Sequence, residues 1–135
     1  NGDVINSHET CDNYDYTMTL EHFLLTTGVV RWADKIDKAV FNAGPGAVTK
    51  DFRSLHYFSS VNQVIATGRS NHNEFFHGST WMAFRPTHET ECCAGNVHRF
   101  MPNYVAHMWL RGKDGSIAAA LYGPSATTFD LPNGR

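Results

Sequence analysis

Three cysteines and one glutamate are the residues of this sequence whose types and spacing suit chemistry. Glu9 and Cys11 are two positions apart, and Cys92 and Cys93 are adjacent. In an extended segment, residues i and i+2 point to the same side, so Glu9 and Cys11 can reach one ion. Adjacent cysteines can do so where a loop turns into a helix. Because zinc accepts thiolate sulfur and carboxylate oxygen together, one Glu and three thiolates make a four-coordinate set.

Two other interpretations of the cysteines stay open. A disulfide framework favours an even count, and three is odd. Adjacent cysteines rarely bridge each other, because the ring that they close is strained. Cys11 can still pair with one of them and leave the other free. Free cysteines are also often buried as small hydrophobic residues. The pattern is not that of a zinc finger, since no Cys-x-x-Cys is present.

The same atoms suit nucleophilic chemistry. A metal-bound thiolate at a helix N-terminus, beside a carboxylate, is a competent covalent catalyst. We expect both the helix dipole and the metal to lower the thiol pKa values. Three thiolate donors reduce the Lewis acidity of zinc. The role expected of the metal is therefore to hold a cysteine deprotonated and oriented, in preference to activating water.

A helical hairpin is expected to position the first of these motifs. Apolar spacing predicts a helix over 14–27, which Asp12 or Asn13 caps and Gly28 ends. A second apolar stripe predicts a helix over 30–43, and a Gly-Pro-Gly sequence stops it. Because the connection between them is very short, the two helices are expected to lie antiparallel.

The middle of the chain is expected to be a long functional insert. Residues 47–90 are rich in Ser, Asn, Gly, His and aromatic residues and have no long periodic stretch. Irregular segments of this length are otherwise uncommon in compact domains. Short strands are expected within the insert at 55–60, 62–67 and 80–85.

The last part of the chain combines a helix with two strands. An apolar face predicts a helix over 94–111, which either kinks or begins at Pro102. After a Lys-Asp-Gly turn, residues 116–122 are expected to form a strand, with residues 127–131 as its partner.

Composition excludes several classes of partner and indicates a fragment. The 135 residues carry a formal charge of −2, which gives no electrostatic reason to expect nucleic acid or an anionic membrane. No signal peptide and no run of about 20 apolar residues is visible. The chain starts at Asn1 without a methionine, and its expected elements do not close a core alone. We therefore expect the remainder of a parent chain to be required.

Four stretches, in this order and separation, are similar to the glycoside hydrolase 127 group, the beta-L-arabinofuranosidase-like proteins once classed as a domain of unknown function. They are SHETCDNYDYT (7–17), ADKIDKAVFNA (33–43), ECCAGNVHRFMPNY (91–104) and AALYGPS (119–125). The Glu-Thr-Cys and Cys-Cys-x-x-Asn elements are the most specific of the shared features. The resemblance runs over essentially the whole chain.

The resemblance implies a fold. Members of the group use an (α/α)6 barrel with attached β-sandwich domains. The fold class expected here is therefore mainly α with β, a partial barrel that runs into a β-sandwich. Residues 1–112 are expected to form the C-terminal part of the catalytic barrel, and residues 113–135 the first strands of the sandwich.

The resemblance also implies a mechanism. In the group, zinc is bound by residues that match Glu9, Cys11, Cys92 and Cys93 here, and the first cysteine of the adjacent pair, Cys92, is the nucleophile. The reaction is retaining and passes through a glycosyl-cysteine. The usual pair of carboxylates is thus reduced to one acid/base, which the group places upstream of the first residue here. The isolated chain is therefore expected to be inactive.

Further residues are candidates for substrate binding. They are His8 beside the glutamate, Tyr57 in the insert and His72 in a polar Asn-His-Asn cluster. The substrate expected from the resemblance is an arabinofuranoside-like or related plant or microbial glycan. Thr90 departs from the pattern, because some members carry a further cysteine there. The alternative function is a non-catalytic, zinc-stabilised carbohydrate-binding or assembly module.

Overall fold

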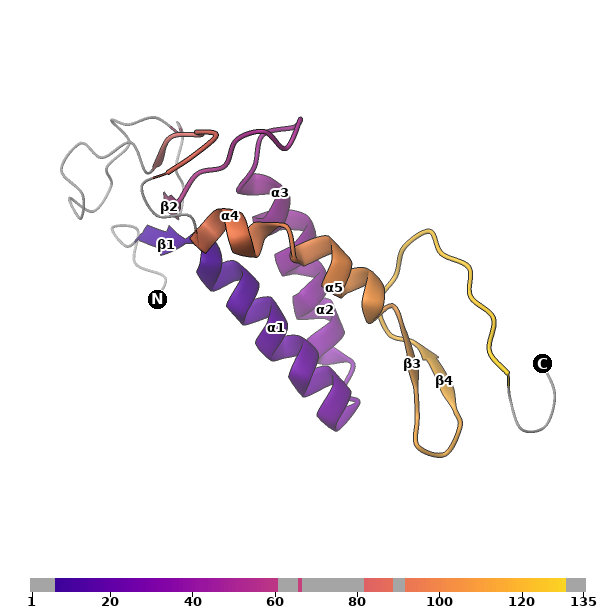
Figure 1. Cartoon of the computed structure of the whole chain (residues 1–135). Helices are drawn as coiled ribbons and strands as arrows, with labels where there is room; N and C mark the ends of the chain where they lie inside the picture. The colour runs from indigo at the N-terminus through magenta and orange to yellow at the C-terminus, as the bar shows by residue number, and fades with distance from the viewer. Residues whose placement is uncertain (1–6, 61–65, 67–81, 89–91, 131–135) are drawn as a thin grey trace.

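The computed structural model describes residues 7–60, 66, 82–88 and 92–130 of the chain. These residues form a mixed helical structure with two small sheets (Figure 1). Two long helical segments run side by side, and the elements of the second half of the chain lie across one end of them and extend to a hairpin. Among the described residues, no helix is long and apolar enough to cross a membrane.

Helix α1 spans Thr10–Thr27 and begins earlier than the apolar pattern predicts. Its N-cap is Glu9, and Asp12 in the first turn accepts a hydrogen bond from the Glu9 backbone N–H at 3.3 Å, as part of a reciprocal capping box. The prediction of Asp12 or Asn13 as the N-cap is therefore wrong, since Asp12 acts from inside the first turn. The predicted end is confirmed, because Gly28 has a φ of 65° and caps the helix.

The second long segment is continuous past its predicted stop. Helix α2 (Arg31–Lys38) runs into a π-helical stretch, η1 (Ala39–Ala43), and then into α3 (Gly44–Gly46). Within this segment the Gly44 N–H bonds to the Ala39 carbonyl, five residues back. Pro45 lies in α3 directly after this π-helical stretch, and the helix continues past it, since the Ala47 N–H bonds to the Ala43 carbonyl. The expected stop at Gly-Pro-Gly is therefore wrong by one helical turn, while the hairpin of α1 with this segment is confirmed.

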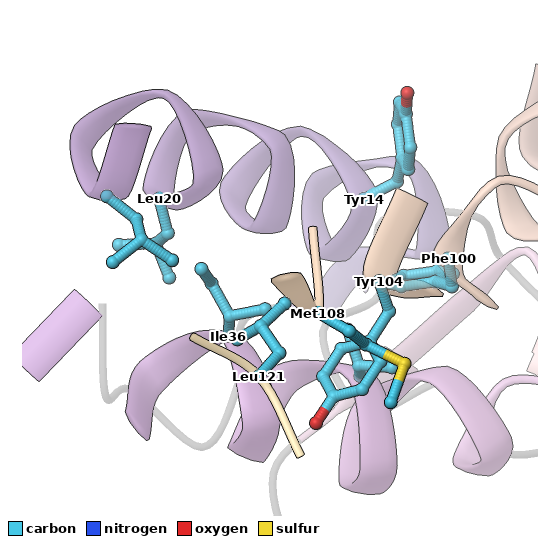
Figure 2. Packing of buried hydrophobic residues seen from close by; sticks show 9 residues of the cluster. Tyr14, Leu20, Ile36, Phe100, Tyr104, Met108 and Leu121 are labelled. Atoms are coloured by element: carbon cyan, nitrogen blue, oxygen red, sulfur yellow. The ribbon is translucent and has the colours of Figure 1, made fainter. Parts of the chain in front are cut away.

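The core lies between the hairpin and the elements that cross it (Figure 2). The Tyr14 and Phe100 rings meet edge to face, with centroids 6.0 Å apart. The Tyr104 hydroxyl lies 3.0 Å from Asp37 Oδ1 and 2.9 Å from the Tyr122 carbonyl, so two acceptors share its proton. The buried members of this cluster are Tyr14, Leu20, Leu24, Ile36, Val40, Phe100, Tyr104, Met108 and Leu121.

The predicted helix over 94–111 is two helices followed by a strand. They are α4 (Cys92–Val97), α5 (Phe100–Ala106) and β3 (Trp109–Arg111). Pro102 lies in the first turn of α5. Its ring would clash with the carbonyl four residues back, at His98, which explains why the chain breaks between the two helices.

The C-terminal hairpin pairs neighbours in sequence. Strand β4 (Ile117–Ala119) confirms part of the predicted strand over 116–122. Its antiparallel partner is β3, and residues 127–130 form no strand, so the predicted partner is wrong. A tight turn closes the hairpin, with Gly115 at a φ of 84°, and closing a short loop costs less entropy than reaching a distant segment. The hairpin straddles residue 112, and the domain boundary expected there stays a prediction.

A second small sheet lies at the start of α1. Strand β1 (Ser7–Glu9) pairs antiparallel with β2 (Phe58–Ser60), and Glu9 lies opposite Phe58. Strand β2 confirms the end of the predicted strand over 55–60. The expected strand over 62–67 lies almost wholly outside the described residues. Of the one over 80–85, the described part contributes a single bridge, from Arg85 to Leu55.

Candidate metal centre

The N-termini of α1 and α4 meet, and this brings the two sequence motifs together (Figure 1). Glu9 ends β1 and caps α1, and Cys11 lies in the first turn of that helix. Cys92 and Cys93 are the first two residues of α4, so they lie at the start of a helix, as expected. One ligand atom from each of these four residues lies within 4.8 Å of all the others.

The separations suit a small tetrahedral cation. Cys11 Sγ lies 3.3 Å from Cys93 Sγ. The Cys92 and Cys93 thiols donate to Glu9 Oε1 at 3.3 and 3.6 Å. Ligand atoms of a tetrahedral zinc site lie roughly 3.3–3.8 Å apart, given zinc–ligand bonds of about 2.0–2.3 Å. Both sulfur–oxygen distances fall in this range, the sulfur–sulfur distance of 3.3 Å lies at its lower end, and the 4.8 Å limit on the widest pair exceeds it by about 1 Å.

All three cysteines are free, and no disulfide joins them. Cys11 and Cys93 are buried, whereas Cys92 is exposed. Burial raises the pKa of the Cys11 thiol to about 12 and raises the pKa of Cys93 as well. These shifts arise in the protein alone, where desolvation is the largest effect, so the lowering expected from the helix dipole together with a bound metal stays a prediction.

The donor set fits a cation for the same reason. A carboxylate and three sulfurs in contact carry strong mutual repulsion when ionised, and two of the sulfurs are buried. Buried anions need a paired positive charge. A thiolate-binding cation would supply such a charge.

Tyr57 completes the cluster from the insert. Its hydroxyl lies 2.7 Å from Cys92 Sγ, and its side chain is only 5% exposed. Burial raises the Tyr57 pKa, so the phenol keeps its proton and donates a hydrogen bond to the sulfur. The sequence selected Tyr57 as a substrate-binding residue, and the structure places it against the nucleophile candidate. The hydrogen bond orients one sulfur of the cluster.

Of the other two substrate-binding candidates, the structure describes His8 and not His72. His8 lies on β1 directly before Glu9, and neighbouring residues of a strand point to opposite faces. His72 lies outside the described residues, as does Thr90.

Two residues near the site were not among the predicted site residues. Asn96 lies on α4, one turn after Cys93, and its side chain lowers the pKa of the Cys11 thiol against the larger effect of burial. Its place in the Cys-Cys-x-x-Asn element was the available signal. Thr10 lies between the two ligands of the first motif and is fully buried. Nothing in its local sequence distinguishes it from the other threonines of α1.

Comparison with known proteins adds one finding. The family model described as the GH127 catalytic domain of beta-L-arabinofuranosidase matches residues 3–106. The matched range contains both ligand motifs and ends with the last residue of α5. No curated protein and no solved structure matches the chain at a significant level.

Proposed function

Because the chain belongs to the GH127 family of beta-L-arabinofuranosidase-like glycoside hydrolases, we propose that it carries the nucleophile half of a retaining glycosidase site. The nucleophile is Cys92, and the substrate is an arabinofuranoside-like or related plant or microbial glycan. The convergence of one carboxylate and three sulfurs supports this proposal. We also propose that residues 1–112 belong to an (α/α)6 barrel and that residues 113–135 begin a β-sandwich.

Four residues would hold the metal: Glu9, Cys11, Cys92 and Cys93. Bound there, zinc supplies the positive charge that keeps the thiols deprotonated and oriented. The remaining chemistry belongs to the chain itself. The short contacts between the ligand atoms mean that little rearrangement is needed to surround an ion.

Exposure supports Cys92 as the nucleophile. Cys11 and Cys93 are buried, so an incoming sugar cannot reach their sulfurs, whereas Cys92 is exposed. The Tyr57 hydroxyl, 2.7 Å from Cys92 Sγ, holds this sulfur in one direction. A fixed sulfur reaches the anomeric carbon with less loss of entropy than a freely rotating one.

In the proposed reaction, the Cys92 thiolate attacks the anomeric carbon while the bond to the leaving oxygen breaks. That oxygen takes a proton from a general acid. The conjugate base then deprotonates a water, which attacks the anomeric carbon, and the sulfur leaves as thiolate. Two inversions at one carbon give net retention.

The acid/base is a second carboxyl group. Within the described part of the chain, Glu9 is the one carboxylate of the cluster, and it already faces two of the thiols. We propose that the acid/base is the glutamate that the family places shortly before the Glu-Thr-Cys element, upstream of Asn1. The 135 residues alone are therefore expected to show no turnover, and measurable glycosidase activity from them would refute this assignment.

Covalent trapping tests the proposal. The intact natural protein is treated with a sugar analogue that carries a cysteine-reactive group at its anomeric carbon, and its intact mass is measured. We expect labelling at Cys92 and none in the Cys92→Ala variant. A non-catalytic, zinc-stabilised carbohydrate-binding or assembly module predicts zinc-dependent stability without labelling. Absence of zinc in the purified protein, together with full activity of Cys92→Ala, would overturn the proposal.

A further inference from the structure

Thr10 differs from every other threonine of α1. The hydroxyls of those four threonines bond to carbonyls four residues back in the same helix, as Thr17 does with Asn13 at 2.7 Å. The Thr10 hydroxyl instead leaves the helix and donates to the carbonyl of His56, 46 residues away, at 2.8 Å. Thr10 is also fully buried. Capping does not explain it, because Glu9 and Asp12 form the capping box.

The backbone of Thr10 makes a second bond to the same segment. Its N–H donates to the Tyr57 carbonyl at 2.9 Å. The first N–H groups of a helix have no partner within the helix, so this bond satisfies one of them. Thr10 therefore holds two consecutive carbonyls of the insert, one with its side chain and one with its main chain.

The segment to which Thr10 is hydrogen-bonded, residues 55–57, also makes hydrogen bonds to other parts of the fold. Leu55 and Arg85 exchange two backbone hydrogen bonds of 3.0 Å, and the His56 N–H donates to Ala47 at 3.1 Å. His88 Nε2 lies 2.8 Å from the Leu55 carbonyl. Leu55 and His56 are thus held to the rest of the fold independently of Thr10.

Water is a poor substitute for the Thr10 hydroxyl. The His56 side chain is buried and stacks on Phe84, with ring centroids 5.0 Å apart. Burial lowers the pKa of His56 to about 4, as expected of a dry environment, and the nearby His88 adds to the effect. A carbonyl that loses its donor there stays unsatisfied, which is costly.

We propose that Thr10 is a positioning residue that sets the metal ligands Glu9 and Cys11 against the segment that orients Cys92. The inference rests on the proposed metal centre. Thr10 separates the two ligands of the first motif, so a rotation of its backbone moves both. Its partner segment carries Tyr57, whose hydroxyl contacts the Cys92 sulfur. This hydroxyl thereby acts with the Thr10 N–H bond and the pairing of β1 with β2 to set the distance between the two halves of the site.

The test compares three variants of the intact natural protein. Thr10→Val removes the hydroxyl and keeps the shape, Thr10→Ser keeps the hydroxyl, and Thr17→Val makes the same change at a buried threonine whose bond stays within α1. Zinc affinity is measured by competition with a chromophoric chelator. Cobalt(II) is then added to the metal-free proteins, and its thiolate charge-transfer band reports the geometry of the sulfurs.

Thr10→Val is expected to weaken zinc binding by about 10- to 100-fold, as loss of a partner behind a ligand typically does. Its cobalt band should also weaken or shift. Thr10→Ser should restore both within about threefold, and Thr17→Val should change neither. If Thr10→Val yields no folded protein, the smaller Thr10→Ala replaces it, and the same changes in zinc affinity and cobalt band are expected.

Three results would overturn the inference. Zinc affinity and a cobalt band equal to wild type in the Thr10 variant would show that the hydroxyl does not position the ligands. Equal losses of affinity in the Thr10 and Thr17 variants would show a general effect of stability. Absence of zinc and cobalt binding by the wild-type protein would refute the proposed function and the inference with it, whereas the first two results leave the proposed function intact.

Discussion

Zinc binding should release protons, and the number follows from the burial of two thiols. The pKa of Cys11 is raised to about 12, and that of Cys93 is raised as well, both chiefly by burial. Both thiols are therefore protonated in the metal-free protein at neutral pH. Because zinc binds the thiolate, each must lose its proton on binding.

The magnitude is set by linkage. Each proton released makes the affinity rise about tenfold per pH unit, so two protons give about 100-fold, or about 2.7 kcal/mol per pH unit. The zinc affinity should increase with pH, because deprotonation of the thiols becomes easier as the pH rises and both pKa values stay above the pH of the measurement. We expect this slope, or a steeper one, between about pH 6.5 and 8.

Titration calorimetry measures the effect directly. The apparent binding enthalpy is recorded in buffers with different ionisation enthalpies, and the slope gives the number of protons released. Cys11→Ser is the matched variant, because a serine hydroxyl does not ionise in this range, and its proton count should fall by one. A pH-independent affinity in the wild-type protein would refute the argument from buried thiols.

Three further predictions concern the scaffold. Burial raises the pKa of Glu21 above its ordinary value of 4.5 despite the neighbouring His107, so the unfolding free energy should fall as pH rises from about that value. Glu21→Gln should weaken this fall in denaturant titrations at several pH values, and an unchanged pH profile would contradict the reasoning. Phe100→Ala should cost about 3–5 kcal/mol in the same assay, whereas Met101→Ala, at a side chain 43% exposed, should cost much less; equal losses would argue against the core in Figure 2. Gly28→Ala should lower the melting temperature, because φ is 65° at this position and a side chain is strained there. A higher melting temperature would show that a side chain causes no strain at the C-cap of α1.

The hairpin of long helices was predictable from the sequence, but its boundaries were not. Apolar spacing every three to four residues marks a helix that packs on one side, and Gly28 marks its end through a local backbone property. The start of α1 depended on Glu9 and Asp12 together, a reciprocal contact that the apolar pattern does not reflect. The stop expected at Gly-Pro-Gly was wrong because the helical segment runs through this sequence, and the Ala47 N–H bonds to the Ala43 carbonyl beyond Pro45.

The strand at Trp109–Arg111 shows a second limit of prediction from apolar spacing. Its residues continue the apolar spacing of the helix before them, so periodicity alone assigned them to that helix. A short turn after Arg111 lets the segment pair with Ile117–Ala119, and the backbone hydrogen bonds of that pairing replace those of a helix. Tertiary pairing outweighs a local preference that is worth only a fraction of a kcal/mol per residue.

The candidate donors are what the sequence offered by itself. Residue type and spacing indicated Glu9, Cys11, Cys92 and Cys93, because close spacing in each motif brings two donors together, but a disulfide and buried free thiols stayed open. The tertiary structure brought the four residues together without a disulfide. The tertiary structure decided which sulfur is exposed and which phenol contacts it. It also placed the Thr10 hydroxyl on a carbonyl 46 residues away. Burial and long-range hydrogen bonds depend on how distant segments pack, and no local pattern records that.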